Sequence, residues 1–270
     1  MAKKEPEKKS KKTKWVVLFW LCIAVLVIAA AMIVVYFVKL NMSQNAYEEL
    51  AEEAHITEAE TEETTEEETE EETTQAAVEI PIDFEALWEQ NEDIYAWIYI
   101  ADTVIDYPIL QDPDDDQYYL DHTVDHVSGY PGAIYTHATY NSTDFTDNVT
   151  VIYGHNMKND TMFGSLSEYK DEEYREEHSE IIIYTPEHIL TYEVVCVVTY
   201  TNWLIPYHFD LTTTEGYAEF LTSLQTDHYI PSWTSDTYDF STDTRMIILS
   251  TCNGNSSQRF LVGAALVSEE

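Results

Sequence analysis

Residues 245–267 read Arg245-Met-Ile-Ile-Leu-Ser-Thr-Cys252-Asn-Gly-Asn-Ser-Ser-Gln-Arg259-Phe-Leu-Val-Gly-Ala-Ala-Leu-Val267, two apolar runs joined by a polar turn. The short, Gly-containing turn predicts that the runs 246–249 and 260–267 are neighbouring strands. This prediction places Cys252 at the end of one strand and Arg259 at the start of the next. A cation beside a cysteine favours the reactive thiolate, so Cys252 is a candidate nucleophile. The alternative is a buried structural cysteine.

The charge of the chain is divided unevenly along its length. Eight of the 13 Lys and Arg residues lie before residue 40, whereas 49 of the 51 Asp and Glu residues follow it. The chain from residue 40 onward has five basic and 49 acidic residues, so its formal charge is −44. Such a surface repels nucleic acid and anionic lipid and favours cationic partners. A nucleic-acid-binding function is therefore excluded.

The pattern of Cys and His residues does not predict a metal site or a cofactor. Cys22 lies in an apolar N-terminal run, and Cys196 lies in a predicted strand, where we expect it in the core. The sequence contains no CxxC or CxxH pair, which argues against structural zinc. His122 and His126 are four residues apart, but no acidic third ligand accompanies them, so solvated or capping roles are favoured.

The N-terminal region predicts a membrane anchor. Residues 15–38 contain no charged residue, Pro or Gly, and about 20 such residues cross a bilayer as one helix. Seven lysines precede this run and only Lys39 follows it, so the positive-inside rule makes residues 1–14 a cytoplasmic tail. A cleaved signal peptide is the alternative, with Ala29-Ala30-Ala31 as the cleavage site. Cleavage there would leave an apolar new terminus, which favours a retained anchor.

Residues 39–80 predict a juxtamembrane segment and a linker. Residues 41–56 can continue as an amphipathic helix, because Tyr47, Leu50, Ala51 and Ala54 share one stripe. Residues 57–74 consist of ten Glu, seven Thr and one Ala. Like charges repel and nothing here can be buried, so we expect a disordered, extended spacer. An acidic interaction tail is the alternative.

Residues 81–270 predict one folded domain, mainly β. Two helices are expected at residues 161–177 and 214–225, and Asp83 can cap a short helix at the start of the domain. About eight strands alternate with these helices, which suggests a β-barrel or sandwich decorated by helices. Besides the two strands quoted first, the expected strands are residues 96–100, 104–110, 132–136, 149–153, 180–185 and 189–200.

His155 is the histidine best placed for chemistry. It follows the predicted strand 149–153 within Tyr153-Gly-His-Asn-Met157, where the Gly lets the chain turn. A ring presented at the rim of a barrel can act as an acid and base for a cysteine nucleophile if the fold brings them together. A papain-like protease is disfavoured, because its Cys precedes its His in the chain.

These motifs resemble those of a sortase, and more narrowly of a class B sortase. The likeness covers about residues 82–267 and keeps the order His, Cys, Arg. The segments that carry it are Tyr153-Gly-His-Asn-Met157, Leu249-Ser-Thr-Cys252, Arg259, Ala96-Trp-Ile98, Ile105-Asp-Tyr-Pro-Ile109, Tyr118-Tyr-Leu120 and Met162-Phe163.

The resemblance implies a sortase-type eight-stranded β-barrel with an N-terminal helix and inserted helices, one of them at residues 214–225. It also implies a cysteine transpeptidase. Cys252 attacks the carbonyl after the Thr of a sorting motif and forms a thioacyl enzyme, His155 transfers the protons, and Arg259 holds the substrate carbonyl or oxyanion. Ser250 and Thr251 are expected to shape the substrate groove.

The expected partners are surface proteins that carry a C-terminal sorting signal, with a cell-wall peptide or a pilin amine as acceptor. The anchor fits a catalytic domain on the extracellular side of a Gram-positive cell membrane. Two alternatives stay open at this point. One is a thiol hydrolase that uses water as the acceptor. The other is a non-catalytic anchored binding module in which Cys252 is structural.

Overall fold

The computed structural model describes residues 8–56, 79–226 and 229–270. The chain divides into two compact units, one ending at Ala46 and one starting at Tyr47. The acidic spacer expected at residues 57–74 lies outside the described residues.

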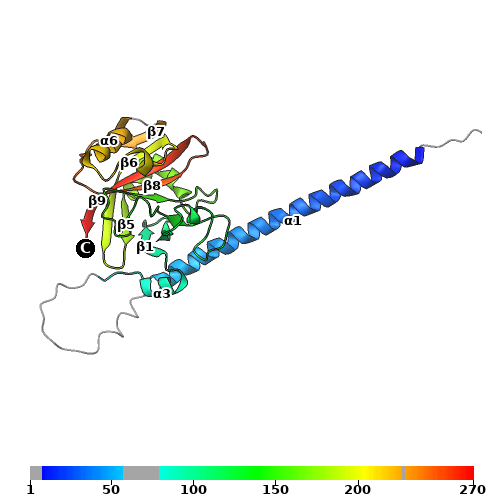
Figure 1. Cartoon of the computed structure of the whole chain (residues 1–270), viewed down its shortest axis with the longest axis horizontal. Helices are drawn as coiled ribbons and strands as arrows, with labels where there is room; N and C mark the ends of the chain where they lie inside the picture. Colours follow the sequence, from blue (N-terminus) through cyan, green and yellow to red (C-terminus); the bar gives the residue numbers. More distant parts are fainter. Residues whose placement is uncertain (1–7, 57–78, 227–228) are drawn as a thin grey trace, which may run out of the picture. The chain divides into compact units, whose positions relative to one another are not determined.

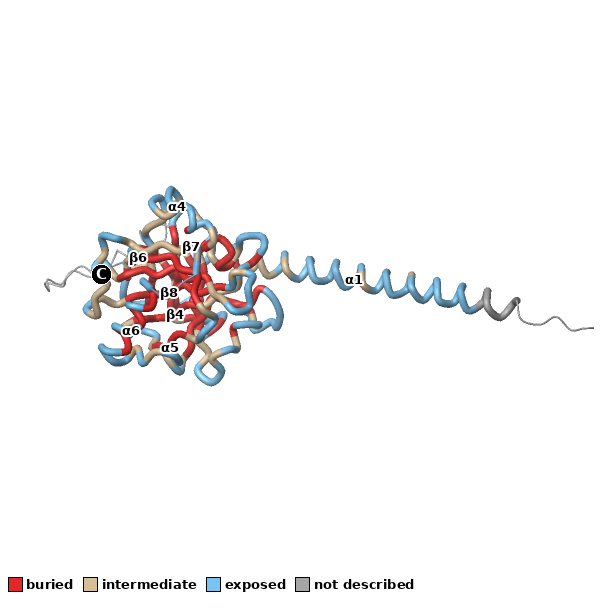
Figure 2. Tube along the Cα trace, turned by 90° about the horizontal axis from the view of Figure 1, so that it is seen from above, coloured by how far each residue is buried: buried red, intermediate tan, exposed pale blue. Residues whose placement is uncertain are grey.

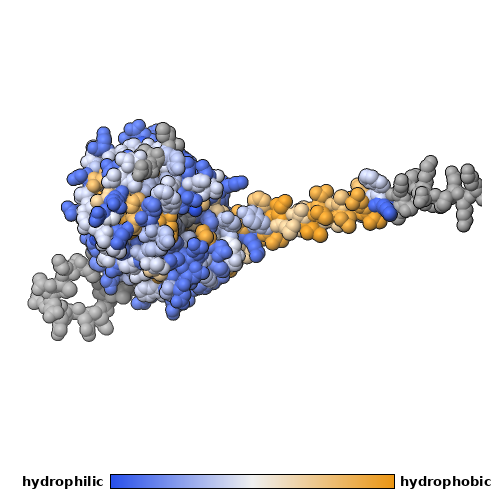
Figure 3. All heavy atoms as spheres, turned by 45° about the horizontal axis from the view of Figure 1, so that its top comes forward, coloured by the Kyte–Doolittle hydropathy of each residue, from blue (hydrophilic) through white to orange (hydrophobic). Residues whose placement is uncertain are grey.

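The first unit is helical. Helix α1 (Lys8–Ala54) includes the predicted anchor and ends within the second unit. Nearly all the large apolar side chains between Trp15 and Val38 are exposed, and the face of the helix seen in Figure 3 is hydrophobic over this stretch. A helix that is apolar all round suits a lipid environment rather than the surface of a folded domain. By length and composition, α1 is therefore a candidate membrane span.

The second unit is built on one sheet in which eight of the nine described strands form a closed barrel (Figure 1). The strand order is β5-β1-β2-β3-β4-β8-β9-β6-β7, and β5 also pairs with β6, which closes the ring and leaves β7 outside it. The eight-stranded barrel implied by the resemblance is confirmed. The strands are β1 (Ile94–Tyr99), β2 (Asp106–Leu110), β3 (Ile134–Tyr135), β4 (Val149–Tyr153), β5 (Glu180–Tyr184), β6 (Ile189–Thr201), β7 (Tyr229–Thr234), β8 (Met246–Cys252) and β9 (Gln258–Glu269).

The helices lie between the strands in the chain. The helix expected at residues 214–225 is α6 (Thr214–Thr226), and Asp83 caps α3 by accepting from the Ala86 amide. The expectation of one helix over residues 161–177 is wrong, because the extended backbone of Asp171 divides the segment. The short helices are α3 (Phe84–Gln90), η1 (Tyr118–Leu120), η2 (Ser165–Lys170), α4 (Glu172–Glu177) and α5 (Ile205–His208).

Strand β7 was not expected from the sequence. It contains Pro231, which cannot donate a ladder hydrogen bond and is tolerated in a sheet only at an edge or bulge. In the described part of the chain, β7 pairs with β6 alone, so it is an edge strand. It pairs with the second half of β6, beyond the residues of β6 that pair with β5.

The core fills the barrel, where the buried residues gather on the strands (Figure 2). Cys196 on β6 is buried, as expected. It faces Gly263 on β9, where an added Cβ would lie 2.5 Å from the Cys196 sulfur. Gly263 is therefore the residue that lets β9 approach β6 at this point. We expect Cys196 to act in packing rather than in chemistry.

The end of α1 packs within the second unit. The Tyr47 hydroxyl donates to the Gly132 carbonyl at 2.8 Å and accepts from the Val124 amide at 3.1 Å. Leu50 and Ala54 are also buried, as the amphipathic stripe predicts. The compact unit therefore begins at Tyr47, well before residue 81, the start of the domain predicted from the sequence.

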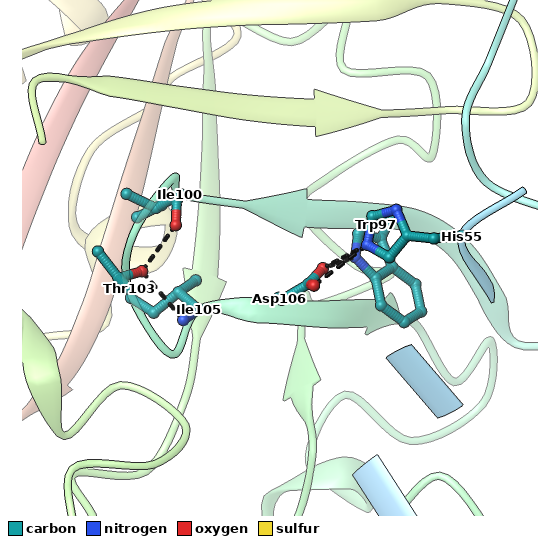
Figure 4. Close-up of polar contacts among 6 residues, drawn as sticks. All are labelled: His55, Trp97, Ile100, Thr103, Ile105 and Asp106. Carbon is teal, nitrogen blue, oxygen red and sulfur yellow. Dashed lines mark hydrogen bonds and ion pairs between the residues drawn. The ribbon is translucent and has the colours of Figure 1, made fainter. Parts of the chain in front are cut away.

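A polar cluster fastens the residue after α1 to the barrel (Figure 4). The His55 Nε2 lies 3.1 Å from both carboxylate oxygens of Asp106 on β2, and the Trp97 Nε1 donates to the same carboxylate at 2.6 Å. The hydrogen bond with Asp106 raises the pKa of His55 above its ordinary value of 6.5, against an opposing effect of burial. The charged form of His55 is therefore favoured in the folded state.

We predict that His55 stabilises the folded domain more at pH 6 than at pH 8.5. A pKa raised on folding adds stability that is fully present below the unfolded value of 6.5 and is lost as the pH rises through the folded value. Since His55 is partly exposed, the contribution should stay under about 1 kcal/mol. Chemical unfolding of the native protein and of His55→Gln at both pH values measures it.

The matched control for this prediction is Asp106→Asn. In that background, His55→Gln should change stability equally at pH 6 and pH 8.5, because the ion pair is already absent. If the effect of His55→Gln does not depend on pH in the native background, the raised pKa has no consequence for stability.

Candidate functional site

The candidate site forms where two parallel strands end together. Tyr153, the last residue of β4, pairs with Ser250 of β8. His155 and Cys252 each lie two residues beyond these partners. Because parallel strands present their carboxyl ends at the same edge of a sheet, this register brings the His-bearing loop beside the end of β8. The proximity expected from the two sequence motifs therefore follows from the pairing of β4 with β8.

The third site residue, Arg259, lies on β9, the antiparallel neighbour of β8. Arg259 on β9 is paired with Cys252 on β8, and its other neighbour is Tyr200 on β6. Side chains of directly opposed residues emerge on the same face, with Cβ atoms about 4.5–5.5 Å apart. Cys252 is exposed and Arg259 is partly exposed. The register thus places the residue that carries the cation directly opposite the residue that carries the thiol.

Three hydrogen bonds join the loop after β4 to the end of β8. The Gly154 amide donates to the Ser250 carbonyl at 3.2 Å. The Thr251 hydroxyl donates to the Gly154 carbonyl at 2.8 Å, and the Asn156 side-chain amide donates to the Cys252 carbonyl at 2.5 Å. One backbone bond and two side-chain bonds thus continue the contact between β4 and β8 beyond Tyr153. They fix the loop that carries His155 against the strand that carries Cys252.

The imidazole of His155 is held by the backbone of a different segment. Its Nε2 lies 2.6 Å from the Leu120 carbonyl, and the Tyr130 ring is 4.9 Å away, centroid to centroid. A carbonyl can only accept, so Nε2 carries a proton here. In the part of the chain that the structure describes, Nδ1 has no hydrogen-bond partner. Nδ1 is therefore the ring nitrogen available for proton transfer.

All the predicted site residues line one pocket with a volume of about 180 Å³; they are His155, Ser250, Thr251, Cys252 and Arg259. No carboxylate lines this pocket among residues 8–56, 79–226 and 229–270. Within the same residues Arg259 forms no ion pair, and its Nη1 donates to the Gln258 carbonyl at 3.0 Å. The guanidinium charge is thus not neutralised by any carboxylate of the described residues.

Three aromatic rings on the pocket wall were not expected from the sequence. His137 stacks on Tyr153 at 4.5 Å between centroids, and Tyr135 lies 5.5 Å from Tyr153. Burial raises the pKa of both tyrosines, which the charge of Arg259 opposes in part. Burial also lowers the pKa of His137, which Asp116 opposes. These rings are therefore neutral near pH 7.

Two polar atoms of this wall are buried without a partner. The His137 Nδ1 and the Tyr153 hydroxyl form no hydrogen bond with the described residues.

The motif Tyr153-Gly-His-Asn-Met157 contained a signal for Tyr153 and Asn156, because both flank His155. His137 and Leu120 reach the site from other segments, and no local pattern distinguishes them from their neighbours.

Ser250 and Thr251 were predicted to contact substrate, which stays a prediction. Both side chains are largely buried, although both residues line the pocket. The Thr251 hydroxyl is committed to the Gly154 carbonyl. In the structure the Thr251 side chain therefore links the end of β8 to the loop after β4.

Comparison with known proteins gives one consistent family. The model of the Sortase domain matches residues 98–267. The "Sortase B" of Listeria monocytogenes is 35% identical over 176 residues, which cover 65% of this chain and 69% of that protein.

Solved structures agree with this result. The sortase B of Clostridium perfringens matches with a TM-score of 0.60 and 25% identity, covering 69% of this chain and all of that one. The sortase B–substrate complex of Staphylococcus aureus matches with a TM-score of 0.66 over 84% of this chain and 97% of that one. At 21% identity, the second likeness concerns the fold alone.

We predict that Asn156→Ala lowers cysteine-dependent peptide turnover by about ten-fold or more, because small misplacements of reacting groups are costly. Asn156 is exposed, so the melting temperature should change little. Asn156→Asp keeps the shape but loses the donor and should behave similarly. The matched control is Asn159→Ala in the same loop. If turnover in Asn156→Ala stays within two-fold of the native value, the bond to Cys252 does not position the site.

Proposed function

The chain belongs to the sortase family, class B, and on that premise we propose that it is a membrane-anchored transpeptidase that uses Cys252 as its nucleophile. Sortases B are cysteine transpeptidases that anchor surface proteins. In our proposal the enzyme cleaves a C-terminal sorting motif of surface proteins and passes the acyl group to a cell-wall or pilin amine. The observation that carries the proposal is the gathering of Cys252, His155 and Arg259 in one pocket.

The first half-reaction breaks the peptide bond of the sorting motif. The Cys252 thiolate attacks the carbonyl carbon, a C–S bond forms, and the carbonyl oxygen becomes an oxyanion. Arg259 stabilises that charge, and its guanidinium is suited to do so because no described residue supplies it with a carboxylate partner. The C–N bond then breaks as His155 gives a proton from Nδ1 to the leaving amine. The product is a thioester on Cys252, and no oxidant or reductant is involved.

The second half-reaction transfers the acyl group. The acceptor amine attacks the thioester carbonyl, a C–N bond forms, and the C–S bond breaks to return the Cys252 thiolate. His155, neutral after the first step, takes the proton that the amine loses. The Leu120 carbonyl keeps the Nε2 proton in place throughout, so that Nδ1 accepts and donates.

The anchor gives the enzyme its proposed location. Sortases act at the cell surface. We assign residues 1–14 to the cytoplasm, residues 15–38 to the membrane, and the rest of the chain, including the compact catalytic unit that begins at Tyr47, to the extracellular side. The excess of lysines before the span supports this orientation.

Two alternative functions can be compared with this proposal. A thiol hydrolase would need the same three residues with water as the acceptor, and an assay with and without an amine separates it from a transpeptidase. A non-catalytic binding module with a structural Cys252 would not require His155 and Arg259 to lie in the same pocket as Cys252. Their common pocket supports catalysis.

We predict that Cys252→Ala abolishes peptide cleavage and the thioacyl adduct, while the protein still folds. Cleavage of sorting-signal peptides and mass spectrometry of the adduct test this. The control Cys196→Ala removes the other cysteine of the catalytic unit and should stay active, because Cys196 is buried away from the pocket. Comparable cleavage by Cys252→Ala would rule out Cys252 as the nucleophile.

We predict that Arg259→Lys loses about 10²–10³ in rate, the usual cost of removing one oxyanion donor. A lysine keeps the charge but presents a compact ammonium on a flexible stem instead of a planar fork of donors. The charge near Cys252 is unchanged, so thiol alkylation should keep its pH profile. Turnover and alkylation are measured on the same variant. A rate within a few-fold of the native enzyme would remove Arg259 from the catalytic residues.

A further inference from the structure

A second and larger hollow adjoins the catalytic pocket. It is an open groove of about 1110 Å³ between α6 and the end of β6. Trp203, Phe209 and Tyr229 supply aromatic surface to it, and Glu215 and Glu219 of α6 supply carboxylates. Thr201 and Trp203 line both the groove and the catalytic pocket. The two hollows therefore meet at the end of β6.

The two hollows differ in charge. The catalytic pocket contains the guanidinium of Arg259 and no carboxylate from the described residues. The groove contains two carboxylates and, from the same residues, no Lys or Arg. Glu215 and Glu219 are four residues apart and so lie on one face of α6. Both are exposed, and neither has an ion-pair partner in the described part of the chain.

We propose that this groove binds the amine acceptor, a peptide bearing protonated primary amines, and guides one amine toward the thioester on Cys252. This inference rests on the proposed transfer reaction. Glu215 and Glu219 attract the ammonium groups of the acceptor, and the partly exposed rings of Trp203 and Tyr229 add cation–π attraction. The reacting amine releases its ammonium proton to solvent, attacks as the neutral amine and passes its second proton to His155, while the carboxylates hold another ammonium group of the acceptor.

The charge contrast also separates the two substrates. The carboxylates of the groove cannot stabilise the oxyanion that develops on the acyl donor. That oxyanion needs the cation of the catalytic pocket. The pocket in turn repels a protonated acceptor until it loses its proton. Each hollow therefore favours one substrate of the transfer, and the shared residues Thr201 and Trp203 mark where they meet.

The test compares the full-length protein in detergent with its Glu215→Gln/Glu219→Gln variant. The acyl donor is a fixed sorting-signal peptide, and the acceptors are Gly-Lys amide and hydroxylamine, which is uncharged at neutral pH. An exposed ion pair is worth up to about five-fold in affinity, so the KM for Gly-Lys amide should rise by roughly five- to ten-fold relative to that for hydroxylamine. Added salt should weaken this preference in the native protein more than in the variant.

The matched control is Glu176→Gln/Glu177→Gln. It removes the same charge from α4, whose residues line neither hollow, and should leave the KM ratio unchanged. Equal KM ratios in all three proteins would overturn the inference. So would a rise in the KM for the sorting-signal peptide alone, because the groove would then hold the donor.

A binding measurement separates the groove from the proposed reaction. Calorimetry of Gly-Lys amide with the full-length Cys252→Ala protein needs no turnover. About five-fold weaker binding after Glu215→Gln/Glu219→Gln supports the groove even if no transfer is seen with the native enzyme, in which case the transfer reaction itself is wrong. Equal binding with normal transfer to hydroxylamine refutes the groove and leaves the proposed function intact.

Discussion

The register of β8 between its two neighbours is the constraint on which the site depends. β8 is buried from Met246 to Thr251, and Cys252 is its first exposed residue. Because side chains alternate along a strand, a slip of one residue would turn Cys252 toward the other face and break its alignment with Arg259. The packed core of the barrel prevents such a slip. The chemistry at the rim is thus set by hydrogen bonds and apolar packing in the barrel wall.

The electrostatics of the site depend on which charged side chains line the catalytic pocket. The chain from residue 40 carries a formal charge of −44, yet no described carboxylate lines the pocket that holds Arg259. A carboxylate beside the guanidinium would compete for the charge that an oxyanion needs. Neutral rings of Tyr135, His137 and Tyr153 occupy the pocket wall instead. The pocket therefore keeps a cation available in a strongly acidic protein.

Much of the fold could be predicted because long apolar runs produced long strands. Residues 149–153 and the β8–β9 hairpin were found from local patterns alone. Strand β7 was missed because Pro231 argues against a strand, and only pairing with β6 at an edge makes it one. At the site, motifs identified His155, Cys252 and Arg259. The Leu120 carbonyl that holds His155 lies 35 residues away and is backbone, so no residue type could signal it.

The closed ring of eight strands has a consequence for divergence within such a family. The chain between β6 and β8 supplies α5, α6 and β7, all of which lie outside the ring. Changes in the length or sequence of such an excursion cost little chain entropy and do not touch the hydrogen bonds that close the barrel. The excursion is nevertheless held to the barrel, because Tyr217, Phe220 and Leu224 of α6 share one buried cluster with residues of the strands. Variation is therefore expected on its exposed residues, while the buried face of α6 and the strands that hold Cys252 and His155 stay as they are.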